Sequence, residues 1–207
     1  MFYYPKFCLF TFLIVKVDGP FPSPSAALFS NWGERGESLA NSGYMISGFS
    51  GFVSSGLLHG LQVSYQRYET YGTYGTSAWQ GTSTGATWVD CGIHPFERTQ
   101  IVRVKGQTIR EQGGFIIPPL EFIARNGKSC KLGDLSAQTS TLSRTPFDIS
   151  NEGYYLSYLS GAQSNWEGIS NNPVINAINF HWKAIPTEDL YSPNEWSFDN
   201  PSITQLR

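Results

Sequence analysis

The feature that most constrains the fold is the alternation of apolar and polar residues near the end of the chain. Residues 155–159 and 178–182 alternate with a period of two, which is the period of a β-strand that buries one face. Between them lies a stretch rich in Asn, Ser and Gly, with one tryptophan and little net charge. No long segment keeps a helical period, and Gly and Pro interrupt the chain about every ten residues, as short strands joined by tight turns require. The sequence therefore predicts an all-β fold.

The composition is poor in charge and rich in aromatic residues. Charged residues make up 14% and aromatic residues 15% of the 207 residues, whereas about a quarter charged is usual. A chain of this length can bury one sizeable core. Its aromatic side chains must either pack inside a β structure or stand exposed as a platform for a ligand. The net charge of −2 and the scattered basic residues argue against a nucleic-acid partner.

The first residues are typical of a targeting segment. Lys6 precedes an apolar run of nine residues, 7–15, which is too short to span a bilayer but suits a secretory signal peptide. Small residues follow this run. The best sequence for signal-peptide cleavage ends at Ala27, and a poorer one ends at Gly19. We therefore expect residues 1–27 to be a signal peptide, cleaved between positions 19 and 27. The mature protein should then be extracellular or stored in a secretory granule, without membrane insertion. The alternative is that this segment is a buried N-terminal strand.

The cysteines fit an oxidising compartment. Cys8 lies in the signal segment, which leaves Cys91 and Cys130 in the mature chain. A pair of cysteines in a secreted domain suggests one disulfide, and two separate buried thiols are the alternative. No Cys/His spacing supports a zinc site, so we expect neither a metal nor another cofactor.

Several short segments carry motifs that occur together, in this order, in one known family. They are residues 59–65 (HGLQVSY), 93–95 (IHP), 101–106 (IVRVKG), 120–128 (LEFIARNGK), 159–161 (LSG) and 176–182 (NAINFHW). Together they resemble the jacalin-related lectins, and the matched region spans residues 29–182. Within that family the sequence is most similar to the animal secretory type, of which the zymogen granule lectin is an example.

This resemblance implies a β-prism of three antiparallel four-stranded sheets over residues 28–183, with residues 184–207 as a tail outside the domain. Family members bind sugars, so glycans or glycoproteins are the expected partners. Many members also form homodimers, although no segment of this sequence marks an interface. The apolar strand residues that should form the core are Leu61, Val63, Tyr65, Val102, Val104, Leu120, Phe122, Leu156, Tyr158, Ile178, Phe180 and Trp182.

In the family, three loops at one end of the prism converge on the sugar. The first corresponds here to a glycine-rich turn at residues 31–37. Gly33 and Gly36 would let the backbone approach a hydroxylated ligand closely, because glycine has no Cβ, and Glu37 would lie beside them. An ordinary hairpin turn would look the same in the sequence.

The second loop corresponds to residues 106–114. Its Gln107 and Arg110 side chains can form hydrogen bonds with sugar hydroxyls. A polar hairpin tip without a binding role explains the segment equally well.

The third loop departs from the family pattern. The family has Gly, three residues and Asp before the closing strand, whereas this chain has Asn172 and Asn176 at those places, after a longer loop. Asn keeps an acceptor oxygen but loses the charge that makes such hydrogen bonds about twice as strong, and Pro173 removes a backbone donor. Trp166, in the inserted stretch, could stack on a sugar or could instead pack on the core.

A catalytic function is not expected. The histidines, His59, His94 and His181, lie at strand ends or turns that the resemblance already explains, and the sequence has no G-x-S-x-G motif. The sequence therefore favours a secreted, metal-independent lectin. The alternative, favoured by the change from Asp to Asn176, is a lectin-fold protein that has lost sugar binding. Such a protein would be a structural or protein-interaction module of a secretory granule, egg coat or extracellular matrix.

Overall fold

Antiparallel strand pairing accounts for nearly all of the regular structure. The computed structural model describes residues 15–21, 30–54, 57–67, 74–77, 80–81, 87–92, 100–111, 114–116, 120–133, 143–165 and 173–186. In this part of the chain, strands β1 to β14 form three antiparallel sheets. The helix α1 (Glu34–Asn41) connects strands β2 and β3, which belong to two different sheets. The all-β prediction is confirmed.

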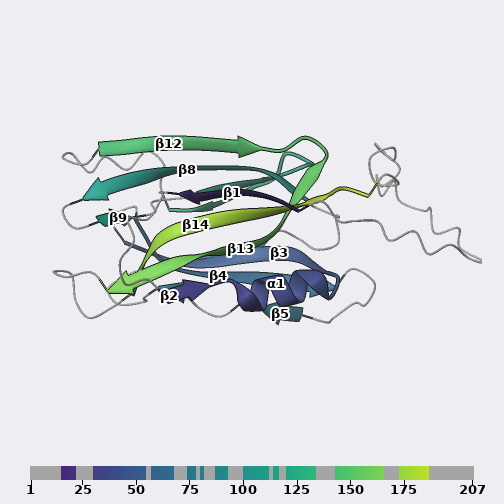
Figure 1. The fold of residues 1–207 in the computed structure, drawn as a ribbon, viewed down its shortest axis with the longest axis horizontal. Helices are drawn as coiled ribbons and strands as arrows, with labels where there is room; N and C mark the ends of the chain where they lie inside the picture. The colour runs from purple at the N-terminus through teal and green to yellow at the C-terminus, as the bar shows by residue number, and fades with distance from the viewer. Residues whose placement is uncertain are drawn as a thin grey trace, which may run out of the picture.

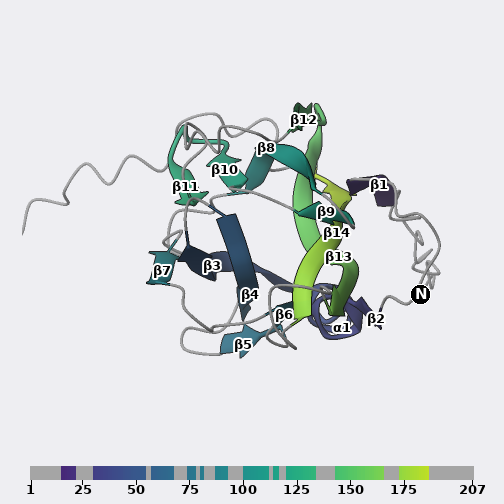
Figure 2. The ribbon, with the colours of Figure 1, turned by 90° about the vertical axis from the view of Figure 1, so that its left-hand side faces the viewer.

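The three sheets form the three sides of a prism, as the view along its axis in Figure 2 shows. Sheet A has the order β1 (Val15–Phe21), β14 (Pro173–Ala184), β13 (Tyr154–Asn165), β2 (Ser30–Trp32). Sheet B has the order β5 (Tyr74–Thr76), β4 (Leu57–Arg67), β3 (Tyr44–Ser54), β7 (Thr87–Gly92), and β6 (Gln80–Gly81) also pairs with β4. Sheet C has the order β11 (Ser129–Leu132), β10 (Leu120–Ala124), β8 (Ile101–Glu111), β12 (Ser143–Ser150), and β9 (Gly114–Ile116) also pairs with β8. Each sheet thus has a path of four strands, and sheets B and C each add one short strand.

The inward faces of the sheets pack against one another in a single apolar core. Phe49 of β3 and Phe122 of β10, both fully buried, stack with ring centroids 3.7 Å apart and so join sheets B and C. Phe147 of β12 and Phe180 of β14 join sheets C and A, with centroids 6.0 Å apart. Of the core residues expected from the sequence, all are buried except Val102, which is half-buried.

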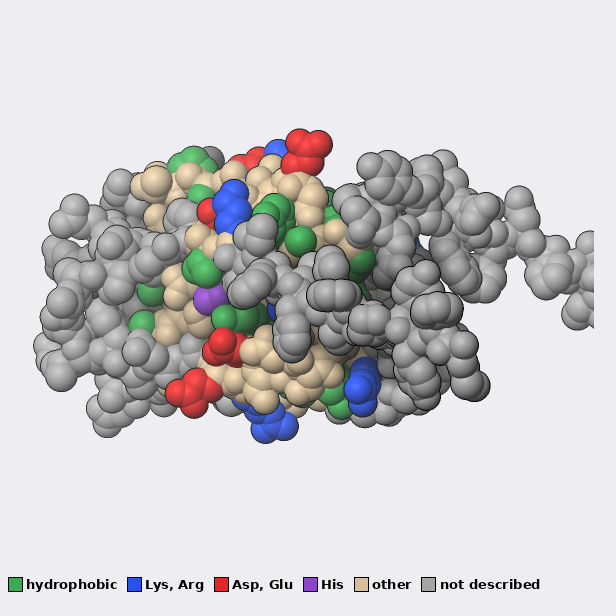
Figure 3. All heavy atoms as spheres, turned by 45° about the vertical axis from the view of Figure 1, so that its right-hand side comes forward, with side chains coloured by type: hydrophobic (Ala, Val, Ile, Leu, Met, Phe, Trp, Pro, Cys, Tyr) green, Lys and Arg blue, Asp and Glu red, His purple; other side chains and the backbone are tan. Residues whose placement is uncertain are grey.

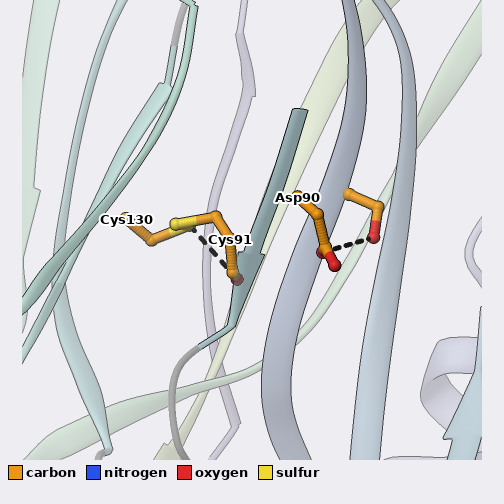
Figure 4. The surroundings of a disulfide bond; sticks show 4 residues. Asp90, Cys91 and Cys130 are labelled. Atoms are coloured by element: carbon orange, nitrogen blue, oxygen red, sulfur yellow. Dashed lines mark hydrogen bonds between the residues drawn. A yellow bond between two sulfur atoms is a disulfide. The ribbon is translucent and has the colours of Figure 1, made fainter. Parts of the chain in front are cut away.

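A disulfide closes one corner of the prism. Cys91 lies on β7, at the edge of sheet B, and Cys130 lies on β11, at the edge of sheet C. Their Cα atoms are 5.6 Å apart, and Figure 4 shows the two side chains meeting between the sheets. The predicted disulfide is confirmed, and it ties together two edge strands that belong to different sheets.

The first described strand, β1, runs along β14 as the outer strand of sheet A. Lys16 Nζ donates a hydrogen bond to Asn151 Oδ1, and Asn151 Nδ2 donates to Asp18 Oδ2 at 2.6 Å. Asn151 is buried, so one buried amide holds two side chains of β1. In the full-length chain β1 is therefore part of the sheet, and a cut between positions 19 and 27 would detach it from the rest of the polypeptide.

Residues 34–41 form a helix, not the glycine-rich turn that the sequence predicts for residues 31–37. Glu34 and Glu37 lie in its first turn, where the helix dipole favours negative charge. Gly36 lowers helix propensity by about 1 kcal/mol, which is why the sequence favours a turn. However, a Cβ at Gly36 would lie 2.7 Å from the Tyr65 hydroxyl. The missing side chain thus lets α1 approach the core, and this packing outweighs the local propensity. Among the described residues no helix is long and apolar enough to cross a membrane.

Candidate functional site

Polar side chains gather on the outer face of sheet A, where β13 pairs with β14. The register places Tyr158 opposite His181 and Ser160 opposite Asn179. These four residues, called the sheet A cluster below, alternate with core residues of the same two strands. The face drawn in Figure 3 shows one histidine among hydrophobic and polar side chains, with acidic side chains beside it.

The sheet A cluster is held together by hydrogen bonds and a ring stack. Ser160 Oγ lies 2.7 Å from His181 Nε2, and Asn179 Nδ2 donates to the same Oγ atom at 3.1 Å. The Tyr158 ring stacks on the imidazole with centroids 4.0 Å apart. The Ser160 hydroxyl is therefore fixed by two neighbours on β14.

Burial and one carboxylate set the protonation of the cluster. Burial lowers the pKa of His181 below its ordinary value, and the nearby carboxylate of Glu37 on α1 opposes this shift only in part. Burial, followed by the charge of Glu37, raises the pKa of Tyr158. His181 Nδ1 is buried and makes no hydrogen bond with the described residues. The neutral imidazole is therefore the favoured form at this site.

Gly33 covers the cluster at the start of α1. Its φ angle is 127°, a conformation that residues with a side chain rarely adopt. A Cβ at Gly33 would overlap Cβ of Ser160 and would lie 2.8 Å from its Cα. Only glycine therefore lets the chain cross β13 here and turn into the helix.

The far end of α1 is anchored to the same sheet. Lys183 Nζ donates to the carbonyl oxygen of Ala40 at 2.8 Å and lies 3.4 Å from Asn41 Oδ1. Lys183 is buried, and its burial lowers its pKa. A cation at the C-terminus of a helix also complements the helix dipole. The helix, and with it Gly33 and Glu37, is thus fixed to sheet A at both ends.

The candidate residues of the first segment, Gly33, Gly36 and Glu37, do not all lie at one site. Gly33 and Glu37 border the sheet A cluster, as described above. Gly36 faces Tyr65 in the core, so it shapes the site by letting α1 pack and does not face outward.

The second group lies mostly in a strand. Residues 106–111 belong to β8 and residues 114–116 to β9, so the loop expected at residues 106–114 is nearly all a β-hairpin. Gln107 lies within β8 and accepts a hydrogen bond from Arg144 Nη1 at 3.2 Å. Arg110 is paired through its backbone with Ser143 of β12. The structure thus has the hairpin that the sequence left open as an alternative for this segment, and the binding role of its residues stays a prediction.

The third group surrounds the connection from β13 to β14. Asn176 lies in β14, at an irregularity in its pairing with β13, and its side chain lies outside the described residues. Trp166 and Asn172 also lie outside the described residues. Asn31 pairs with Ala162 of β13, and Ala162 pairs with Ala177. This ladder places β2, which leads into α1, and the Asn176 segment of β14 on opposite sides of β13.

The second and third groups of segments meet at one end of the prism. In Figure 1 the tips of β8 and β13 and the start of β14 lie at the same end, and β9 contacts β14 across the sheets. Helix α1 begins further along the prism, where Gly33 lies against Ser160 in the middle of β13. The binding roles of their residues stay predictions.

The sheet A cluster is not marked as a site by any local motif of the sequence. Tyr158 and Ser160 are two residues apart on β13, as Asn179 and His181 are on β14, so the period of two placed each pair on one face. The missing information was the register between the strands, which decides that Ser160 meets His181.

The cluster suits hydrogen bonding better than nucleophilic catalysis. A Ser–His pair becomes a strong nucleophile when a third group accepts a hydrogen bond from the other imidazole nitrogen. In the described part of the chain, no group fills that place at His181 Nδ1. The described residues also contain no group of three or more His, Cys, Asp or Glu that could hold a metal ion.

We predict that Gly33→Ala is much more harmful than an alanine at another glycine with positive φ. Gly127 has a φ of 84°, and a Cβ added there would meet no atom within 4 Å, so Gly127→Ala should cost only the backbone strain, about 1–2 kcal/mol. Gly33→Ala adds overlap with Ser160, which should cost about 1–3 kcal/mol more. Urea unfolding of both variants measures the difference. Equal losses would show that the close contact with Ser160 has no energetic weight.

We predict that His181 makes the protein less stable in mild acid. Because its pKa is lowered on folding, the unfolded chain takes up the proton first as pH falls. The free energy of unfolding should therefore be unaffected above about pH 6.5 and should fall between this value and the folded pKa, below which the loss is constant. His181→Gln should remove this component, with His59→Gln as the matched control. Unfolding curves over this pH range test it, and an unchanged pH profile in His181→Gln would contradict it.

Solved structures with the same arrangement of sheets are lectins. Frutapin, a lectin from Artocarpus incisa, matches with a TM-score of 0.57 and 15% identity, over 83% of this chain and 97% of that chain. Single-chain recombinant jacalin matches with a TM-score of 0.57 and 18% identity, over 83% and 95% of the two chains. A prostate-specific WGA16 glycoprotein lectin matches with a TM-score of 0.51 and 20% identity, over 77% and 94%.

No family model matches the sequence, and no curated protein does. At identities of 15–20% the likeness concerns the fold. The chain has the β-prism fold of the jacalin-related lectins.

Proposed function

We propose that the protein is a metal-independent lectin of the animal secretory type. In this proposal, glycans bind at the end of the prism where the β8–β9 and β13–β14 connections lie, and the first turn of α1 borders the site along sheet A. The observation that supports the proposal is the position of these two connections at one end of a fold whose solved neighbours are lectins. The proposed contacts are Gly33, Glu37, Gln107, Arg110, Trp166, Asn172 and Asn176.

The chemistry of these residues suits a neutral sugar. The amides of Gln107, Asn172 and Asn176 both donate and accept hydrogen bonds, as sugar hydroxyls do. Asn176 in place of an aspartate offers a weaker acceptor, so the site should bind single sugars weakly and gain from an aromatic contact at Trp166. Several copies of a weak site on one surface would raise the avidity.

We predict that the purified chain binds glycans on an array in the presence of a chelator. Asn176→Ala and Trp166→Ala should each weaken this binding about tenfold or more, because each removes a proposed contact at the same end of the prism. Glu152→Ala is the matched control, since Glu152 is exposed and lies between β12 and β13. A silent array with a folded, disulfide-bonded protein would move the conclusion to a protein-interaction module.

We further propose that the protein enters the secretory pathway. The disulfide between Cys91 and Cys130 fits an oxidising compartment, and the apolar run at residues 7–15 fits a signal peptide. A cut between positions 19 and 27 would remove Lys16 and Asp18, the two residues of β1 to which Asn151 is hydrogen-bonded.

We predict that secretory cells release the protein with a mature N-terminus between residues 20 and 28. N-terminal sequencing of the secreted protein measures this position. A mature chain that begins at or before Val15 would contradict the predicted cleavage and would keep β1 in sheet A. Retention of the unprocessed chain inside the cell would contradict secretion itself.

A further inference from the structure

The outer face of sheet B carries an exposed aromatic side chain on an edge strand. Trp88 of β7 is 49% exposed, and among the described residues Val17 is the other large hydrophobic side chain with such exposure. Phe52 lies directly opposite Trp88 on β3, and its ring meets the indole edge-on with centroids 5.1 Å apart. The indole is therefore supported from one side by a second aromatic ring and remains open to solvent.

Polar groups lie next to these rings on the same face. Asp90 is two residues along β7 from Trp88, a separation of about 7 Å in a strand. Ser50 lies opposite Asp90 and donates its hydroxyl to Asp90 Oδ1 at 3.0 Å. Gln62 lies opposite Ser50 on β4 and donates its amide to the carbonyl oxygen of Ser77 at 3.2 Å, and Ser50 is only 6% exposed. Two aromatic rings and one exposed carboxylate, Asp90, thus lie side by side on β3 and β7.

The alternation along β7 directs these groups outward. Val89 packs against the core, and Cys91 forms the disulfide with sheet C. Figure 4 shows Asp90 pointing away from Cys91, toward the neighbouring strand of sheet B. The disulfide therefore fixes an edge strand in place and orders the exposed face before any ligand binds, which reduces the entropy cost of binding.

The charge on this face favours a neutral ligand. The side chains named here are aromatic, amide and hydroxyl groups together with one carboxylate. Asp90 carries the one charge among these side chains, and it would repel an anionic ligand. A second copy of the chain, docked through a two-fold axis on this face, would bring two Asp90 carboxylates together, and burying unpaired charges is costly.

We infer that the outer face of sheet B at its edge strand, formed by Trp88, Phe52 and Asp90, is a second carbohydrate-binding surface for neutral polysaccharide chains. The indole presents the negative face of its π system to the apolar C–H side of a sugar ring. Asp90 accepts hydrogen bonds from sugar hydroxyls, and a charged acceptor strengthens them. The inference shares only the class of ligand with the proposed function and uses none of the residues at the end of the prism.

Affinity electrophoresis of the full chain in gels that contain yeast mannan, laminarin or galactomannan tests this inference. We expect at least one polysaccharide to retard the chain, and Trp88→Ala to weaken the retardation about tenfold or more, as loss of a stacking contact does. Trp88→Phe should restore part of it, and Asp90→Asn should weaken it because the hydroxyl acceptor loses its charge. Val17→Ala is the matched control, since Val17 is the other exposed hydrophobic residue and lies on sheet A. Circular dichroism and urea unfolding establish that each variant is folded.

Parallel measurements on Asn176→Ala separate the two proposals. If Trp88→Ala loses retardation while Asn176→Ala keeps it, the surface on sheet B is supported independently of the end of the prism. If Asn176→Ala loses all binding and folded Trp88→Ala binds as the parent does, the inference is wrong and the proposed function stands. Absence of retardation in all three gels also overturns the inference. So does a dimer, measured by sedimentation, that Trp88→Ala converts to a monomer without changing polysaccharide binding.

Discussion

The packing of three inward faces around one apolar core is the constraint on which the rest of the structure depends. Each strand must place apolar side chains inward at every second position, and the stacked rings of Phe49 and Phe122 lie where sheets B and C meet. The side chains at the alternate positions, which face outward, are free to differ from sheet to sheet. Sheet A therefore carries the hydrogen-bonded cluster around His181, sheet B the exposed Trp88 beside Phe52, and sheet C the ion pair of Arg103 with Asp148, at 2.5 Å.

The sequence was a good guide wherever a local period decides the outcome. The alternation at residues 178–182 correctly predicted that Ile178, Phe180 and Trp182 are buried. The prediction held for nearly the whole core because a half-buried strand has only two choices of face, and one apolar row determines which is inside. The pairing of Cys91 with Cys130 followed from their number and the expected compartment, and the structure adds that they join different sheets.

The sequence was a poor guide wherever distant residues decide. Helix α1 contains Gly36, which argues against a helix, and depends on Tyr65 and Lys183, which lie far along the chain. The pairing of Ser160 with His181 depends on the register of β13 with β14, including its irregularity between Leu156 and Tyr158. Local patterns could assign each residue to a face but could not show which partner it meets there.

The position of β1 has a consequence for how the molecule meets other chains. With β1 in place, β14 lies inside sheet A and its backbone groups are paired on both sides. Without residues 15–21, β14 would become an edge, with a row of free amide and carbonyl groups next to the buried Asn151. Such an edge is a template onto which an extended segment from another molecule can add as a strand. While residues 15–21 stay attached, β1 blocks such strand addition, and the hydrogen bonds of Asn151 with Lys16 and Asp18 hold it in place. The cleavage proposed above would instead leave the edge of β14 open to another chain.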